Sequence, residues 1–483
     1  MTNAVGLPRL STQDAPAPQS MVFVDKVALG AVTLALLLFP FVNILHFAVP
    51  VRDVAGKSGW LVGVTAILVL AYFLTARRGW RDMLWEQRFI IGATLIVCGI
   101  VLVRAGIYDE STIPINFRFI IIALISISLS AALIQRGAGD SLTALLCAQG
   151  ILVTLLIYLN MNYFPNIRIA EDESGLTGII FNGERTRSML INASIGSNAI
   201  VTSMFVLVAW INTKRQALDT LGKYIALWFV LLLMSYCVSL TGTRYPMFAS
   251  VAVLALAFFL LPKRLSVLGI VIAATLVAGV PVVIDAVITY VLQLVAYALQ
   301  LAAHLMQLDV SQAGGQSGGS LFNPNFEWKL QSDAAPILRL EQDSGGRVEK
   351  LMLALRMITN GPLNMLIGAS FQEVATTRSA NGFVFSDNSF ATILLETGIP
   401  AGLLLVGAFA LYLRRYATTL LGLCFALYLV GSLCFTNGIL WDSWVASVFF
   451  AFPVIYMLTQ PQSQVRNTNG PADGSTDLSG VQA

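Results

Sequence analysis

The sequence predicts an all-α polytopic membrane protein with about 12 transmembrane helices and a long helical loop between spans 9 and 10. Hydrophobic residues make up 57% of the 483 residues and charged residues only 11%, and the mean hydropathy is +0.76. Apolar runs of about 20 residues recur, each long enough to cross a hydrocarbon core about 30 Å thick. These runs lack the two-residue alternation of barrel strands, so helices are the structure that satisfies their backbone in lipid.

Polar or basic connecting pieces divide the apolar runs into successive spans. We predict nine spans within residues 27–284, a loop over 285–397 and three more spans within 398–460. Residues 1–26 and 461–483 are predicted to be flexible tails, the first because its start is polar and rich in proline. The predicted spans are 27–46, 60–75, 89–104, 118–135, 142–160, 192–212, 224–240, 245–261, 265–284, 398–413, 418–435 and 444–459.

The basic residues of the connecting pieces predict the orientation of the spans. Arg136 and the pieces WRDMLWEQR, NTKRQALDTLGK, PKR and LRRY all lie on one side if the spans alternate. Cytoplasmic loops carry an excess of Lys and Arg, so this side and both termini are predicted to be cytoplasmic. Two cytoplasmic termini require an even number of spans, which the predicted set satisfies.

The run from Leu265 to Gln307 contains no Lys or Arg and is too long for one crossing of a bilayer. Pro281 and Asp285 mark the predicted break. After the break, polar residues recur on one helical face, and His304 is among them. We predict an amphipathic helix on the outer membrane surface; the alternative is a tilted thirteenth span, which the basic LRRY piece opposes.

Composition argues against several classes of function. The cysteines all lie in apolar runs, where they are expected to be small buried hydrophobes rather than disulfide partners. His46 and His304 are the only histidines, and no cluster has metal-ligand spacing. No charged residue is expected in the middle of a span, and no internal repeat is visible, which argues against a proton-relay or secondary transporter.

Arginines at the outer ends of spans are the candidate binding residues. Arg185 and Arg187 precede a span, and Arg244 lies in the short turn LTGTRYPMF between two spans. Arg347 follows SGG at a predicted helix start, whose free N–H groups suit an anion. A guanidinium binds phosphate through two hydrogen bonds, so these residues indicate a lipid diphosphate; the alternative is that they extend toward lipid headgroups.

The segments that carry these arginines are followed by a fourth segment, and the four occur in the same order as in a known family. In this respect the chain resembles the bacterial O-antigen polymerase and ligase superfamily of integral-membrane glycosyltransferases. The matching segments cover roughly residues 182–405 and are RTRSMLINASIGSN, LTGTRYPMF, SGGRVEKLMLALRMITNGPLNMLIG and SDNSFATILLETGIPAGLLL. The resemblance implies a long external loop above a cavity for an undecaprenyl-diphosphate-linked glycan. It assigns diphosphate binding to Arg244 and Arg347, with Arg185 or Arg187 as weaker matches.

One difference from the ligase branch favours the polymerase branch. Ligases usually have His-Asn where this chain has Asp387-Asn388, and polymerases of the superfamily often lack that histidine. A carboxylate near the membrane border can accept a proton from an attacking sugar hydroxyl within hydrogen-bonding reach, so Asp387 is the candidate base and Asn388 a candidate substrate-binding residue. The alternative makes Asp387 the N-cap of the helix SFATILLE.

Asp442, in the turn TNGILWDSW, matches an acidic position late in the ligase pattern, which makes it a further candidate substrate-binding residue. The alternative is that this turn, with Trp441 and Trp444, anchors the chain at the membrane interface.

The resemblance implies a metal-independent polymerase without a cofactor, in the bacterial inner membrane, with its active site on the periplasmic side. Its expected partners are a lipid-linked glycan donor and acceptor, membrane lipids and a chain-length regulator, and no nucleic acid. The alternatives are a ligase that transfers glycan to lipid A-core or protein, and a flippase or transporter of lipid-linked glycan. A transporter is disfavoured by the expected lack of ionisable groups within the spans and by the long outer loop.

Overall fold

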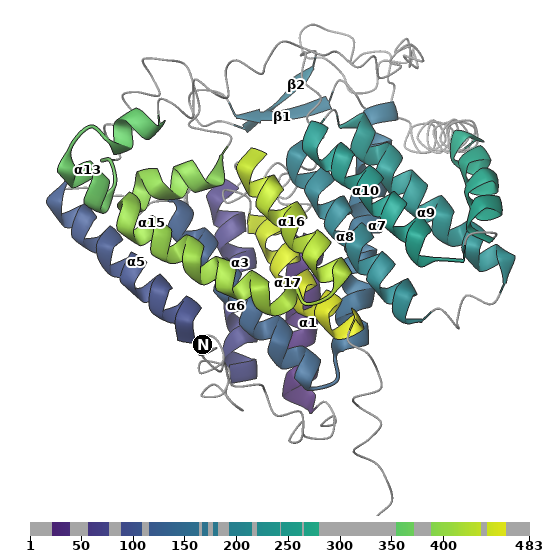
Figure 1. The fold of residues 1–483 in the computed structure, drawn as a ribbon, viewed down its shortest axis with the longest axis horizontal. Helices are drawn as coiled ribbons and strands as arrows, with labels where there is room; N and C mark the ends of the chain where they lie inside the picture. The colour runs from purple at the N-terminus through teal and green to yellow at the C-terminus, as the bar shows by residue number, and fades with distance from the viewer. Residues whose placement is uncertain are drawn as a thin grey trace, which may run out of the picture.

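The computed structural model describes residues 22–38, 57–76, 88–108, 115–163, 167–171, 177–181, 193–214, 220–241, 243–262, 265–279, 354–370, 388–435 and 442–459. These residues form a bundle of apolar helices, as the sequence predicts (Figure 1). Within these residues, four helices are long and apolar enough to cross a membrane, and seven shorter apolar helices accompany them. The chain is a polytopic membrane protein.

The helices lie where the apolar runs predict them. The parts of the first and ninth predicted spans beyond residues 38 and 279 lie outside the described residues. The helices are α1 (Phe23–Leu38), α3 (Lys57–Ala76), α5 (Arg88–Ile107), α6 (Ile115–Gln135), α7 (Gly139–Tyr163), α8 (Ala193–Thr213), α9 (Leu221–Leu240), α10 (Arg244–Leu260), an unnumbered helix over 265–279, a short helical segment over 354–358, α13 (Pro362–Ile367), α15 (Ser389–Tyr416), α16 (Leu420–Phe435) and α17 (Asp442–Thr459).

A short β-hairpin accompanies the helices and was not predicted. It lies in the connection from α7 to α8 and consists of β1 (Ile167–Glu171) and β2 (Thr177–Phe181). The strands are antiparallel, with Ile167 opposite Phe181. Both strands carry β-branched residues, which favour extended backbone, so a local signal for the hairpin is present in the sequence.

Helix α8 is the central helix of the bundle and packs against α7, α9, α10 and α17. Small residues let it approach α7 closely: a Cβ on Gly150 would lie 2.2 Å from the Cβ of Ser203. The Ser203 hydroxyl also donates to the carbonyl of Leu146 at 2.8 Å. In lipid, helices associate through such close packing and interhelical hydrogen bonds.

Contacts between helix ends show which ends share a side of the bundle. Arg136, after α6, donates to Asp25 Oδ1 of α1 at 2.6 Å and to the Thr75 carbonyl of α3 at 2.9 Å. The start of α7 joins them, because a Cβ on Gly139 would meet the sulfur of Met457 near the end of α17. We call this side the Arg136 end. The basic residues of the LRRY piece end α15 on this side, next to the Thr419–Thr459 hydrogen bond that joins α16 to α17.

The opposite side, which we call the Arg244 end, holds the ends of α5 and α9 and the starts of α8, α10 and α15. Alternation of the helices requires this arrangement, and Figure 1 shows the hairpin across the same end. The buried charged side chains of the described spans lie at helix ends. Asp25 is in the first turn of α1 and Arg104 in the last turn of α5, and they are 1% and 2% exposed.

Candidate functional site

Arg244 and Asn388 are the predicted site residues whose side chains the structure describes. Asp442 is the first residue of α17. The remaining predicted positions lie outside the described residues: Arg185, Arg187, Arg347 and Asp387, together with the predicted surface-helix residue His304.

Arg244 is the first residue of α10, and its side chain is exposed at the Arg244 end. Three hydroxyl groups bond to one another at the turn that precedes it in the chain. The Ser197 hydroxyl of α8 is 2.8 Å from that of Thr241 and 2.7 Å from that of Thr243, and the two threonine hydroxyls are 2.7 Å apart. This hydroxyl cluster joins the start of α8 to the turn that carries Arg244.

The hydroxyl cluster brings together two of the segments singled out in the sequence. Ser197 belongs to NASIGSN, which follows Arg185 and Arg187 in the chain, and Thr241 and Thr243 belong to LTGTRYPMF. Because the three hydroxyls bond to one another, the α9–α10 turn has a fixed position relative to α8.

Tyr245 fixes the first turn of α10 from the other side. Its hydroxyl donates to the carbonyl of Tyr428 in α16 at 2.8 Å, and the two rings stack with centroids 6.0 Å apart. Gly431 leaves room for the ring, since a Cβ there would lie 2.1 Å from the Tyr245 hydroxyl oxygen. The Tyr428 hydroxyl in turn donates to Asn198 Oδ1 of α8 at 2.7 Å, and the Ser432 hydroxyl donates to the same oxygen at 3.1 Å. Arg244 therefore begins a helix that is bonded to both α8 and α16.

Asn388 is the N-cap of α15, a position that the alternative interpretation gave to Asp387. Its side-chain oxygen accepts a hydrogen bond from the backbone N–H of Ala391 at 3.0 Å. This is the usual capping geometry, in which a polar side chain satisfies a free N–H of the first helical turn. The assignment of the cap to Asp387 is therefore corrected to Asn388.

A sharp kink divides α15 at Gly398, whose φ is 77°. Only glycine adopts this backbone conformation readily, and a Cβ there would lie 2.4 Å from the carbonyl oxygen of Leu366. Ala369 N–H donates to the Leu395 carbonyl at 2.8 Å across the same contact. The first half of α15 thus packs on the segment 366–369, which includes the end of α13.

Arg104, in the last turn of α5, and Tyr108, just after it, bond to the two segments that meet at the α15 kink. Neither residue was predicted as a site residue. Arg104 Nη1 donates to the carbonyl of Glu396 at 2.5 Å. The Tyr108 hydroxyl is 2.9 Å from Asn364 Oδ1 and 3.3 Å from the Gly368 carbonyl. These bonds tie the end of α5 to the described segments 354–370 and 388–435, so both segments are joined to it at the Arg244 end.

The sequence contains a weak signal for Arg104. It is the one charged residue in the last turn of the apolar run LIVCGIVLVRAG, where charge is ordinarily taken to mark the end of a span. Its function as a hydrogen-bond donor depends on Glu396, which lies 292 residues away in the sequence. Spacing within the run therefore does not reveal it.

The arrangement places a positive charge at one end of the bundle, on a helix that is hydrogen-bonded to its neighbours. Exposed Arg244 lies where polar groups of α8, α9, α10 and α16 meet, and a guanidinium there suits an anionic ligand. In the part of the chain that the structure describes, no three His, Cys, Asp or Glu side chains lie together as metal ligands would.

Comparison with known families identifies the region that contains these features. Residues 229–406 match the family model described as Wzy_C, O-antigen ligase. The matched region includes Arg244, the segment 354–370, the cap at Asn388 and the kink at Gly398. No curated protein matches the chain. Residues 229–406 of this chain are therefore similar to the O-antigen ligase family, and the match does not distinguish the polymerase branch of the superfamily from the ligase branch.

Proposed function

We propose that the protein is a polysaccharide polymerase that elongates a lipid-linked glycan on the periplasmic side of the bacterial inner membrane. In the proposed reaction, the bond between the donor glycan and its diphosphate breaks. A hydroxyl oxygen on the sugar of a second lipid-linked repeat unit forms the new glycosidic bond. The hydroxyl proton passes to a base, and undecaprenyl diphosphate leaves.

In this proposal, Arg244 and Arg347 bind the donor diphosphate and stabilise the charge that builds on it as the bond breaks. Arg185 and Arg187 assist them, and Asp387 acts as the base. Asn388 and Asp442 contribute to the substrate site. Asn388 caps the start of α15 and directly follows Asp387 in the chain. No cofactor is assigned, and a chain-length regulator is the proposed protein partner.

The observation that carries the proposal is that the residues on both sides of Arg244 are hydrogen-bonded to neighbouring helices. An arginine that only extends toward headgroups has no need of a fixed backbone. Here the residues on both sides of Arg244 are bonded to other helices, through Thr243 to α8 and through Tyr245 to α16. Holding a cation in one place before the ligand arrives is what electrostatic stabilisation of a leaving group requires.

The ligase remains the second candidate, because the matching family model is described as O-antigen ligase. The residue before Asn388 favours polymerase, because Asp387 stands where the ligase pattern has histidine. A transporter is a weaker candidate: in the described spans, the buried charges Asp25 and Arg104 lie at helix ends rather than at the bilayer midplane.

Genetic complementation tests the proposal. In a cell that lacks its own polymerase, the wild-type chain should restore a ladder of surface glycan on a gel. Arg244→Ala should lower the polymerisation rate by roughly 100-fold, the range found when one transition-state donor is removed. Arg244→Lys should recover only part of that loss, because an ammonium lacks the two-pronged geometry.

The matched control is Arg356→Ala, since Arg356 is another exposed arginine in the region matched by the family model. It should leave the ladder unchanged, whereas Arg347→Ala and Asp387→Ala should reduce it to a single capped repeat. Unchanged ladders in the Arg244, Arg347 and Asp387 variants would refute the site. If the wild-type chain leaves only single capped repeats in this host but restores surface-attached glycan in a cell that lacks its own ligase, it is a ligase.

A further inference from the structure

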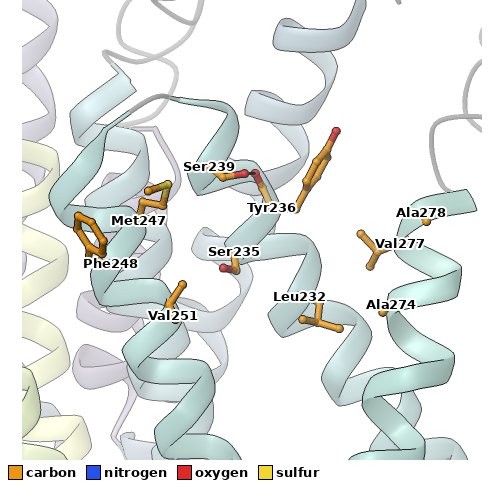
Figure 2. A pocket seen from close by; sticks show the side chains of 10 residues that line it. All are labelled: Leu232, Ser235, Tyr236, Ser239, Met247, Phe248, Val251, Ala274, Val277 and Ala278. Atoms are coloured by element: carbon orange, nitrogen blue, oxygen red, sulfur yellow. Dashed lines mark hydrogen bonds between the residues drawn. The ribbon is translucent and has the colours of Figure 1, made fainter. Parts of the chain in front are cut away.

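A groove of about 750 Å³ opens between α9, α10 and the helix over 265–279. Figure 2 shows side chains from all three helices around it. Its volume is in the range of sites that bind small organic ligands. The apolar wall includes Leu232, Met247, Phe248, Val251, Ala274 and Val277.

The groove lies in the half of the bundle toward the Arg244 end. Helix α9 contributes residues of its last turns, up to Ser239, and α10 contributes Met247 to Val251 of its first turns. The third helix contributes Ala274, Val277 and Ala278, near the end of its described part. Phe248 and Val251 are 67% and 56% exposed. In a transmembrane helix such apolar exposure faces lipid, so the groove is open to the membrane.

Arg244 belongs to the same face of α10 as the groove wall. Met247, Phe248 and Val251 follow it at spacings of three, four and seven residues, which place all four side chains on one stripe of the helix. The stripe therefore has a cation at the membrane border and apolar side chains below it. An amphiphile with an anionic headgroup and a hydrocarbon chain has the complementary arrangement.

The two serine side chains of the wall are bonded within the protein. The Ser235 hydroxyl is 3.0 Å from the Ser250 hydroxyl, and the Ser239 hydroxyl donates to the backbone carbonyl of Tyr236 at 2.6 Å. A hydrocarbon chain in the groove would therefore leave these two serine hydroxyls with their hydrogen bonds intact, and it would meet methyl and aromatic groups elsewhere.

We propose that this groove holds the hydrocarbon chain of the polyisoprenyl diphosphate whose headgroup lies at Arg244. The inference rests on the proposed function, since it names where the lipid part of the donor binds. Ordinary phospholipid is the competing occupant, but its single phosphate carries less negative charge than a diphosphate. Arg244 at the top of the stripe therefore favours the glycan carrier.

The groove would mainly orient the bound lipid and would add little to the affinity of the protein for it. A chain that leaves the bilayer for an apolar groove gains little, because lipid tails are already apolar. A chain held along α10 would instead point its diphosphate toward Arg244 and limit the positions that the reacting bond can take.

Photo-crosslinking of the full-length protein tests this inference directly. The photoreactive residue p-benzoyl-phenylalanine would replace Phe248 in one variant and Phe259 in a matched control. Phe259 is 74% exposed and lies three turns further along nearly the same face of α10, toward the Arg136 end. Each variant is placed in vesicles of phosphatidylethanolamine and phosphatidylglycerol with radiolabelled polyisoprenyl diphosphate.

The probe at Phe248 should capture at least fivefold more labelled carrier than the probe at Phe259. Adding Arg244→Ala should lower capture at Phe248 to the level of the control. Equal capture at both positions, capture of phospholipid alone, or capture that is unchanged by Arg244→Ala would each overturn the inference.

A second variant separates this inference from the proposed function. Ala274→Phe should fill the groove and raise the apparent KM for lipid-linked donor at least threefold. Leu276→Phe, at an exposed position outside the groove lining, should leave KM unchanged. Capture at Phe248 without any glycan ladder would refute the polymerase and keep the groove, whereas a normal ladder with no capture and no effect of Ala274→Phe would refute the groove alone.

Discussion

At the scale of single residues, uncharged polar side chains hold the Arg244 end together. Asn198 accepts hydrogen bonds from Tyr428 and Ser432, and Ser197 next to it bonds to both threonines of the α9–α10 turn. These residues lie in the segment NASIGSN, which follows the candidate residues Arg185 and Arg187 in the chain. Sequence could not show their pairing, because Tyr428 is 230 residues away from Asn198.

Replacing Asn198 with alanine should destabilise the protein. The change removes the oxygen that accepts from two buried hydroxyls, and a buried group that loses its partner costs about 1–3 kcal/mol. The loss should appear as a lower midpoint of thermal unfolding in detergent. Asn360→Ala, at an exposed position, should change stability by no more than about 0.5 kcal/mol. Equal stability of the two variants would show that the Asn198 contacts do not matter.

At the scale of elements, the positions of the helices could be predicted because the bilayer requires about 20 apolar residues per crossing. The run that starts at Gly398 was predicted as a new span, and the structure places the α15 kink at that residue. The direction of the first half of α15 could not be predicted. It depends on Leu366, Gly368 and Arg104, which contact it from other elements.

Gly398→Ala should disturb the kink. The new Cβ would be strained at φ 77° and would meet the Leu366 carbonyl oxygen at 2.4 Å, so we expect a loss of about 1–3 kcal/mol in stability. The control is Gly407→Ala in the straight half of the same helix, where a Cβ would meet nothing within 4 Å. That change should be neutral or slightly stabilising. Both variants are compared by thermal unfolding in detergent; an unaffected Gly398→Ala protein would mean that the kink does not depend on glycine.

At the scale of the whole molecule, the alternation of helices collects the segments of interest at one end. Arg244, Asn388 and the segment 354–370 come from different parts of the chain, yet helix ends and hydrogen bonds place them all at the Arg244 end. The sequence could predict this because it depends only on the number of crossings and on which loops are basic. It could not predict that α5 supplies Arg104 and Tyr108 to the same end, since an apolar run gives no information about its neighbours.

The most direct test of the account is a reaction with defined components. Purified protein in vesicles would receive a synthetic repeat unit linked to polyisoprenyl diphosphate, and the products would be followed by mass spectrometry. We predict lipid-linked glycans of two or more repeats together with free polyisoprenyl diphosphate, and Arg244→Ala should lower the rate at which both form by roughly 100-fold. An unextended repeat unit, or transfer that occurs only after lipid A-core is added, would contradict the account.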